Sequence, residues 1–185
     1  ARTIRLQVVY ADFLTFSQNN PEKAKSVLEN ALLFSSSKFE RARIKLKLGD
    51  ILVFTGKYNK ALRYFSQIQT QLKNHELAHL ARFKVAQTSY FKGDFTWAKT
   101  QLKVLKNATS QLIANDAVAL FLTITDNEPV DAIPSGLAQY SKATLLAFQN
   151  KTQQAIDTLS SISLHYKGQP IEDEALFKQA KLLIK

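Results

Sequence analysis

The strongest candidate for chemistry in this sequence is the segment His75–His79, which reads HELAH. Two histidines four residues apart share one face of a helix, where they can bind zinc while the intervening glutamate activates water. A catalytic zinc also needs a third protein ligand, and no His, Asp or Glu occurs between His79 and Asp94. A solvated helix start, with Glu76 near the positive end of the helix dipole, explains the same residues. We expect such a helix start here, and a zinc hydrolase is the third functional hypothesis.

Other patterns that carry catalysis are missing. The chain has no cysteine and only 5 glycines, and it contains neither a Gly-x-Ser-x-Gly turn nor a glycine-rich phosphate loop. The carboxylates of Glu172–Glu174 favour a helix start, where they interact with the dipole. The sequence therefore predicts a protein that is not an enzyme and that carries no cofactor and no metal.

Charge is distributed unevenly along the chain. The formal net charge is +10 over 185 residues. Residues 1–106 hold 19 Lys and Arg against 7 Asp and Glu, whereas residues 107–185 hold 6 against 8. A basic first half attracts anionic partners, and Lys99, Lys103 and Lys106 share one helix face. A nucleic-acid-binding helical protein is therefore the second functional hypothesis, although most of the lysines are expected to be an ordinary solvated surface.

The elements that must position any such residues follow from an internal repeat. Four segments share an alanine followed at +4 and +7 by apolar residues, which is one face of a helix. These alanines are Ala24, Ala61, Ala98 and Ala155. Five residues before each one stands a residue that readily adopts the left-handed conformation at a helix end, namely Asn19, Gly56, Gly93 and Asn150. Each segment is therefore predicted to be a helix, a tight turn and a second helix.

Close packing within each hairpin is also predicted. Twelve residues before three of the alanines stand the small residues Gly49, Ala86 and Ala143, whereas the first copy has Asp12. Small side chains at this position let the two helices of a hairpin approach closely. A single hairpin cannot bury both of its apolar stripes, so neighbouring hairpins must stack on one another.

We expect an all-α chain of about ten helices and no strand. Their approximate ranges are 3–18, 20–34, 37–55, 58–73, 75–92, 94–106, 110–125, 134–149, 151–163 and 171–184. The predicted domain is one solenoid over residues 1–185, with repeats at about 3–36, 37–73, 75–106 and 134–163, an extra helix at 110–125 and a lone helix at 171–184. Thr109 or Ser110 is expected to cap the extra helix. The lone last helix and the absence of an initial Met suggest an excerpt of a longer chain. No apolar stretch reaches the ~18 residues of a spanning helix, so no transmembrane segment is expected.

These repeats resemble tetratricopeptide repeats, whose unit carries a small residue in its first helix and an alanine in its second. The matching residues of the second copy are Leu48-Gly49, Gly56, Tyr58, Ala61 and Phe65, and those of the third are Ala86, Gly93, Phe95, Ala98 and Leu102. Stretches 81–98, 112–117 and 171–177 are also similar to long repeat proteins of the Bacteroidota. The resemblance implies a right-handed α–α superhelix that acts as a protein-binding scaffold. It also implies export to the periplasm or cell envelope, and the alternative compartment is the cytoplasm.

In tetratricopeptide arrays the first helix of each hairpin lines a concave groove that binds peptide or helical segments. Carried over by repeat position, the partner-binding residues are Arg43, Phe54, Phe83, Gln87, Tyr90, Phe91, Tyr140 and Phe148, with Phe13 and Phe16 as further candidates. Aromatic and arginine side chains are the types that most often anchor interfaces. The alternative is that several of them belong to the core. The expected partners are other proteins, with acidic segments favoured by the basic first half.

Overall fold

All regular structure in the described part of the chain is helical. The computed structural model describes residues 2–105, 110–129 and 135–184, and in these ranges it has ten α-helices, one π-helical turn and no strand. The prediction of an all-α chain with about ten helices is confirmed. The elements are α1 (Arg2–Asp12), η1 (Phe13–Ser17), α2 (Pro21–Phe34), α3 (Lys38–Phe54), α4 (Tyr58–Gln71), α5 (Glu76–Phe91), α6 (Phe95–Leu105), α7 (Gln111–Thr125), α8 (Leu137–Phe148), α9 (Thr152–His165) and α10 (Pro170–Leu183).

The four tight turns form where the sequence predicts them. Asn19, Gly56, Gly93 and Asn150 have φ angles of 49°, 75°, 82° and 59°. Glycine has no Cβ to clash in this left-handed region, and asparagine tolerates it better than most residues. Each turn ends one helix and reverses the chain into the next, which makes the two helices antiparallel neighbours.

Side-chain caps explain why several helices begin where they do. The first backbone N–H groups of a helix have no partner inside it. Asn20 accepts a hydrogen bond from the N–H of Lys23, and Ser37 accepts one from the N–H of Phe39. Asp94 likewise accepts one from the N–H of Trp97. These polar residues fix the starts of α2, α3 and α6.

The repeat alanines lie at the contacts between paired helices. All four are fully buried, and so are Ala86 and Ala143 of the partner helices. The closest approach is at Gly49 of α3, where an added Cβ would lie 2.2 Å from a ring carbon of Phe65 in α4. The small residue therefore makes room for the aromatic ring of the second helix.

The first predicted helix is irregular at its end, and one of the two candidate caps of the extra helix is wrong. The first helix does not run as a regular α-helix to residue 18, because Phe13–Ser17 form a π-helical turn in which the N–H of Gln18 bonds to the carbonyl of Phe13. The hydroxyl of Thr15 donates to the carbonyl of Ala11 at 2.8 Å, a side-chain bond that competes with regular helix geometry. The side chain of Ser110 makes no capping bond to α7, and Thr109, the other predicted cap, lies outside the described residues.

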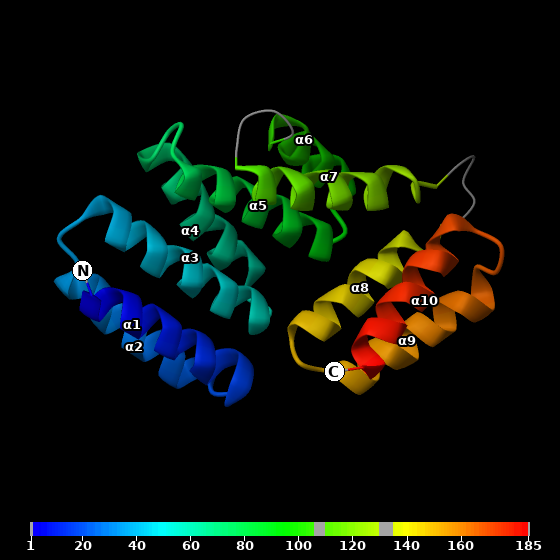
Figure 1. Cartoon of the computed structure of the whole chain (residues 1–185), viewed down its shortest axis with the longest axis horizontal. Coiled ribbons are helices and arrows are strands. Elements are labelled where there is room, and N and C mark those ends of the chain that lie inside the picture. The colour runs from blue at the N-terminus through cyan, green and yellow to red at the C-terminus, as the bar shows by residue number, and fades with distance from the viewer. Residues whose placement is uncertain (1, 106–109, 130–134, 185) are drawn as a thin grey trace.

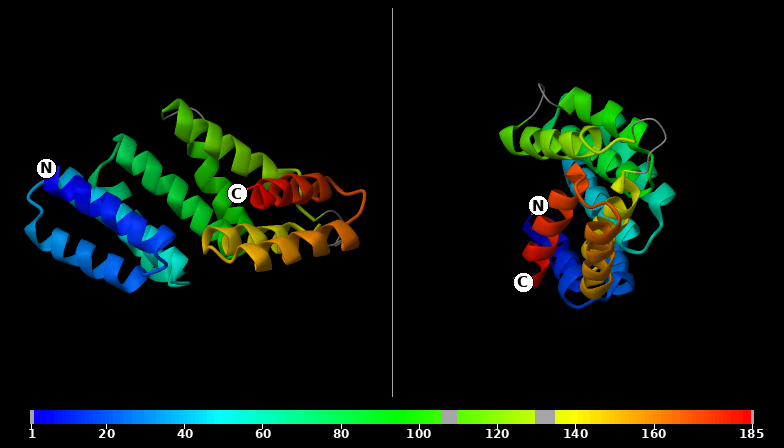
Figure 2. Two further views of the ribbon diagram at one scale, coloured as in Figure 1. Left: turned by 60° about the horizontal axis from the view of Figure 1, so that its bottom comes forward. Right: turned by 90° about the vertical axis from the view of Figure 1, so that its right-hand side faces the viewer.

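The helices succeed one another along the long axis of the molecule. In Figures 1 and 2 the α1–α2 hairpin lies at one end and α8, α9 and α10 lie at the other. Each hairpin packs internally, and the first helices of successive hairpins touch: α1 contacts α3, α3 contacts α5, α5 contacts α8, and α8 contacts α10. The extra helix α7 packs on α5 and α6. Helix α5 therefore has neighbours on several sides, and its residues line three clefts.

Replacing Gly49 with alanine tests the close contact between α3 and α4. Alanine inside a helix normally stabilises it by about 1 kcal/mol relative to glycine. Here the added methyl group would overlap Phe65, so Gly49→Ala should lower the free energy of unfolding by about 1–3 kcal/mol, as measured by denaturant titration. The same substitution in a Phe65→Leu background should be neutral or stabilising. A stabilising effect of Gly49→Ala in the wild-type background would contradict the contact.

Candidate functional site

Six of the predicted partner-binding residues line one cleft. The cleft has a volume of about 520 Å³ and is formed by α5, α7, α8 and α10; we name it the α5–α8 cleft. Its predicted members are Phe83, Gln87, Tyr90, Phe91, Tyr140 and Phe148. The volume falls in the range of about 300–1,000 Å³ that is typical of ligand pockets. The structure thus places most of the candidate residues together on a concave surface.

Helical spacing explains how α5 contributes its side of the cleft. Phe83, Gln87 and Tyr90 are separated by four and three residues, so they lie on one face. Phe83 and Gln87 are half-buried, whereas Tyr90 is only 2% exposed. Tyr140 of α8 is 7% exposed. The two tyrosines therefore form the floor of the cleft, and the half-buried side chains form its accessible wall.

The floor carries neutral phenol groups. Burial raises the pKa of Tyr90, and the nearby Tyr140 and Glu174 raise it further, while hydroxyl groups of Thr144 and Ser141 act in the opposite direction. Burial and the Glu174 carboxylate raise the pKa of Tyr140 as well. Both phenols therefore stay protonated in ordinary buffers. The floor is therefore apolar apart from hydroxyl groups.

The sequence prediction misses the two other walls of this cleft. Helix α7 contributes Asp116, Ala119, Leu120 and Thr123, and α10 contributes Lys178 and Leu182. The pair Asn115-Asp116 is polar within an otherwise apolar segment, which is the one sequence signal that could have pointed to α7. Nothing in the repeat pattern indicates that α10 reaches the same cleft as α5.

Phe54 does not reach the α5–α8 cleft. It is 8% exposed, and its ring meets the ring of Phe16 edge-on with the centroids 5.4 Å apart. Phe16 meets Phe148 in the same manner at 5.4 Å. Phe148 continues the contact to Phe91 at 5.9 Å. Phe54 and Phe16 therefore belong to an aromatic row that joins helix ends, so the core alternative holds for Phe54, as it does for the buried Tyr90 and Tyr140 of the cleft floor.

Phe13 and Arg43 lie elsewhere. Phe13, a further candidate for the groove, is 48% exposed and is not among the lining residues of the α5–α8 cleft. Arg43 is exposed and lines a second cleft of about 540 Å³ between α1, α3 and α5, which we name the α1–α5 cleft. Arg5 of α1 also lines it. Neither arginine forms an ion pair within the described residues.

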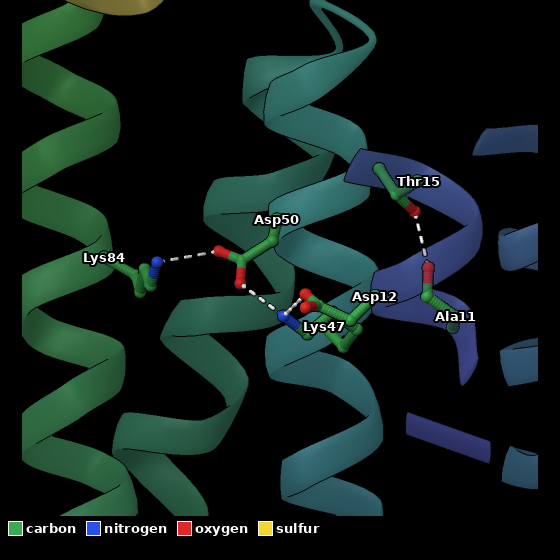
Figure 3. A network of polar contacts seen from close by, with 6 residues as sticks. All are labelled: Ala11, Asp12, Thr15, Lys47, Asp50 and Lys84. Atoms are coloured by element: carbon green, nitrogen blue, oxygen red, sulfur yellow. Dashed lines mark hydrogen bonds and ion pairs between the residues drawn. The ribbon is translucent and has the colours of Figure 1, made fainter. Parts of the chain in front are cut away.

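A chain of ion pairs crosses the α1–α5 cleft. Lys47 of α3 pairs with Asp12 of α1 and, at 3.5 Å, with Asp50. Asp50 in turn accepts Lys84 of α5 at 3.0 Å. Figure 3 shows these four side chains lying in sequence from α1 across α3 to α5. Because Asp50 is buried and serves two lysines, this network ties the first helices of three successive hairpins together.

The first histidine of the HELAH segment caps the start of α5. His75 lies just before α5, and its Nδ1 accepts the N–H of Leu77 at 3.1 Å. Its ring also packs against Phe39 with the centroids 4.8 Å apart. The expected helix start is confirmed, with His75 as its cap. No group of three or more potential metal ligands is present within residues 2–105, 110–129 and 135–184.

Several basic residues that favoured the nucleic-acid hypothesis have partners within the chain. Lys99 pairs with Glu128 at 2.6 Å, and Arg41 donates to the carbonyl oxygens of Ser35 and Ser36. Lys103 is exposed, and Lys106 lies outside the described residues. Lys99, the first of the three lysines predicted to share a face of α6, is therefore held in an ion pair.

Comparisons with known proteins do not assign the chain to a family. No model of a known protein family, no curated protein sequence and no solved structure matches this chain. Among the described residues, no helix combines the length and apolar content that a membrane crossing requires.

Substitution of Asp50 tests whether the ion pairs of Figure 3 hold the hairpins together. Asp50→Asn removes the carboxylate that serves both Lys47 and Lys84, so we expect a loss of about 2 kcal/mol in unfolding free energy. The matched control is Lys25→Gln, which breaks a surface pair with Glu29 at 3.6 Å and should cost under about 0.5 kcal/mol. Equal effects of the two substitutions would show that the buried network adds nothing.

Proposed function

We propose that this chain is a non-catalytic, protein-binding scaffold built as a solenoid of tetratricopeptide-like hairpins. Support for the solenoid comes from two features. The first helices form the succession α1, α3, α5, α8 and α10 by contact, and the repeat alanines and left-handed turns recur at matching positions in four hairpins. A right-handed superhelix is part of this proposal.

The observation that carries the binding function is the α5–α8 cleft. Apolar side chains from four helices line this space of about 520 Å³. They are Phe83 and Phe91 of α5, Leu120 of α7, Phe148 of α8 and Leu182 of α10. Aromatic side chains around a pocket provide large contact areas at low entropic cost, which is typical of interface anchors. We propose that one or two large apolar side chains of a partner segment fill this cleft.

Polar groups at the cleft can orient the partner. Gln87, Thr123 and Thr144 line it beside the apolar side chains. The basic first half of the chain would raise the association rate with acidic segments.

Truncation of the accessible wall tests this assignment. The double substitution Phe83→Ala and Leu120→Ala removes half-buried apolar groups from α5 and α7 without opening the fully buried floor. The immobilised wild-type chain and the double variant are each used to capture proteins from a nuclease-treated lysate of the source cell. The affinity of each retained protein is then measured. Partner affinity should fall by about tenfold or more, as for a truncated hot spot.

The matched control is Trp97→Ala, which removes an aromatic side chain that is 49% exposed on α6 and outside this cleft. It should leave partner affinity within about twofold of the wild-type value, in line with residues outside a hot spot. Equal losses in both variants, or no loss in the Phe83/Leu120 variant, would show that the cleft is not the binding surface. Retention that vanishes with nuclease, or falls steeply between ~50 and ~200 mM salt, would instead favour nucleic acid.

A further inference from the structure

A third cleft differs from the others in its charge. It lies between α4, α5 and α6, has a volume of about 520 Å³, and is named here the α4–α6 cleft. Its lining residues are Gln69, Thr70, Lys73, Asn74, Ala78, His79, Arg82, Val104 and Leu105. Two of them are cationic, one is a histidine, and none is a carboxylate. The second histidine of the HELAH segment, which the proposed function does not use, thus lies beside an arginine and a lysine.

Three other clefts each have a carboxylate among their lining residues, namely Asp116 in the α5–α8 cleft, Asp50 in the α1–α5 cleft and Glu29 in the cleft between α2 and α4. In the α1–α5 cleft, Asp50 accepts both Lys47 and Lys84. The cleft between α2 and α4 is lined by lysines too, and two of them have carboxylate partners: Lys25 pairs with Glu29 at 3.6 Å and Lys57 with Glu22 at 3.8 Å. These pairs offset the repulsion between like charges held at short range.

Among the described lining residues of the α4–α6 cleft there is no carboxylate. Within the residues that the structure describes, Lys73, His79 and Arg82 form no ion pair. The charges of Lys73 and Arg82 add to those of a basic first half, which favours an anionic ligand in this cleft. An anion bound there would remove the repulsion and gain charge-assisted hydrogen bonds.

The hydrogen-bond donors that line the α4–α6 cleft suit a phosphate group. The guanidinium of Arg82 offers a planar fork suited to phosphate oxygens, and Lys73 offers a point charge. The amide groups of Gln69 and Asn74 can donate further hydrogen bonds. A metal cation fits poorly, because His79 has an arginine and a lysine as its neighbours in the cleft. This arrangement argues against zinc at His79.

The cleft also has an apolar side. Val104 is 50% exposed, and Ala78 and Leu105 line the cleft near it. A volume of about 520 Å³ matches a small organic ligand. We propose that the α4–α6 cleft binds the phosphate group of a small organic phosphate, with Arg82, Lys73 and His79 holding the oxyanion and the organic part lying against Val104. This site is separate from the α5–α8 cleft and does not depend on the proposed scaffold function.

Calorimetric titration of the full chain tests the proposal, with inorganic phosphate and adenosine monophosphate as probes at constant ionic strength. Both should bind saturably at one site, and adenosine monophosphate should bind more tightly because of its organic part. Arg82→Gln removes the bidentate cation and should weaken binding by about tenfold or more. Because Arg82 is only half-buried, the variant should keep the wild-type unfolding temperature.

The matched control is Arg63→Gln, which removes an exposed arginine that lines the neighbouring α2–α4 cleft. It should change the affinity for both probes by less than about twofold, since screened surface charges contribute little. Equal weakening by both substitutions would overturn the proposal, because it would mean diffuse attraction to a basic surface. Binding that does not saturate would overturn the proposal too, and so would a correctly folded Arg82→Gln variant that binds both probes with wild-type affinity. Equal affinities of the wild-type chain for the two probes would contradict the contact between the organic part and Val104.

Discussion

Phe148, at the end of α8, contacts both the beginning and the middle of the chain. Its ring lies 5.4 Å from that of Phe16 and 5.9 Å from that of Phe91, measured between centroids. The two residues that follow it strengthen the same junction. Gln149 donates to the carbonyl of Phe54 at 3.0 Å, and Asn150 donates to the carbonyl of Phe16 at 2.7 Å. These bonds satisfy carbonyl groups at the ends of α3 and η1 that have no partner within their own helices.

The cleft that we assign to partner binding depends on this junction. With the end of α8 held against α3 and η1, its beginning lies along α5, where the Ser141 hydroxyl donates to the Tyr90 carbonyl at 2.6 Å. Helix α8 thereby becomes the wall opposite α7. Helix α7 packs on α5 and α6, and it encloses a cleft only because α8 also lines that space.

Helix α5 is the element that both halves of the molecule use. On one flank, Lys84 donates to the buried carboxylate of Asp50 and completes the network across α1 and α3. On another flank, Phe83 and Gln87 face the α5–α8 cleft. Consecutive turns of one helix therefore contribute to both the ion-pair network and the α5–α8 cleft.

The hairpins were predictable from sequence because their signals are local. The left-handed residues Asn19, Gly56, Gly93 and Asn150 each require only a tight turn, and the alanines five residues later mark a helix contact. The convergence of α5 and α8 residues followed from repeat position alone. The roles of Phe54, α7 and α10 could not be predicted, because they depend on contacts between different hairpins, as in the bond from Gln149 to the carbonyl of Phe54, 95 positions earlier in the chain. The π-helical turn at Phe13–Ser17 has no signature in the apolar pattern.

The most direct test of this account is a proton NOE measurement between selectively labelled phenylalanine rings in the intact chain. The account predicts cross-peaks from Phe148 to both Phe16 and Phe91, residues far apart in sequence. The Phe16–Phe54 pair, at 5.4 Å between centroids, is the internal reference because it does not involve α8. A clear reference peak without either Phe148 peak would contradict the account, since α8 would then not lie against the earlier helices and the four-helix cleft would not exist.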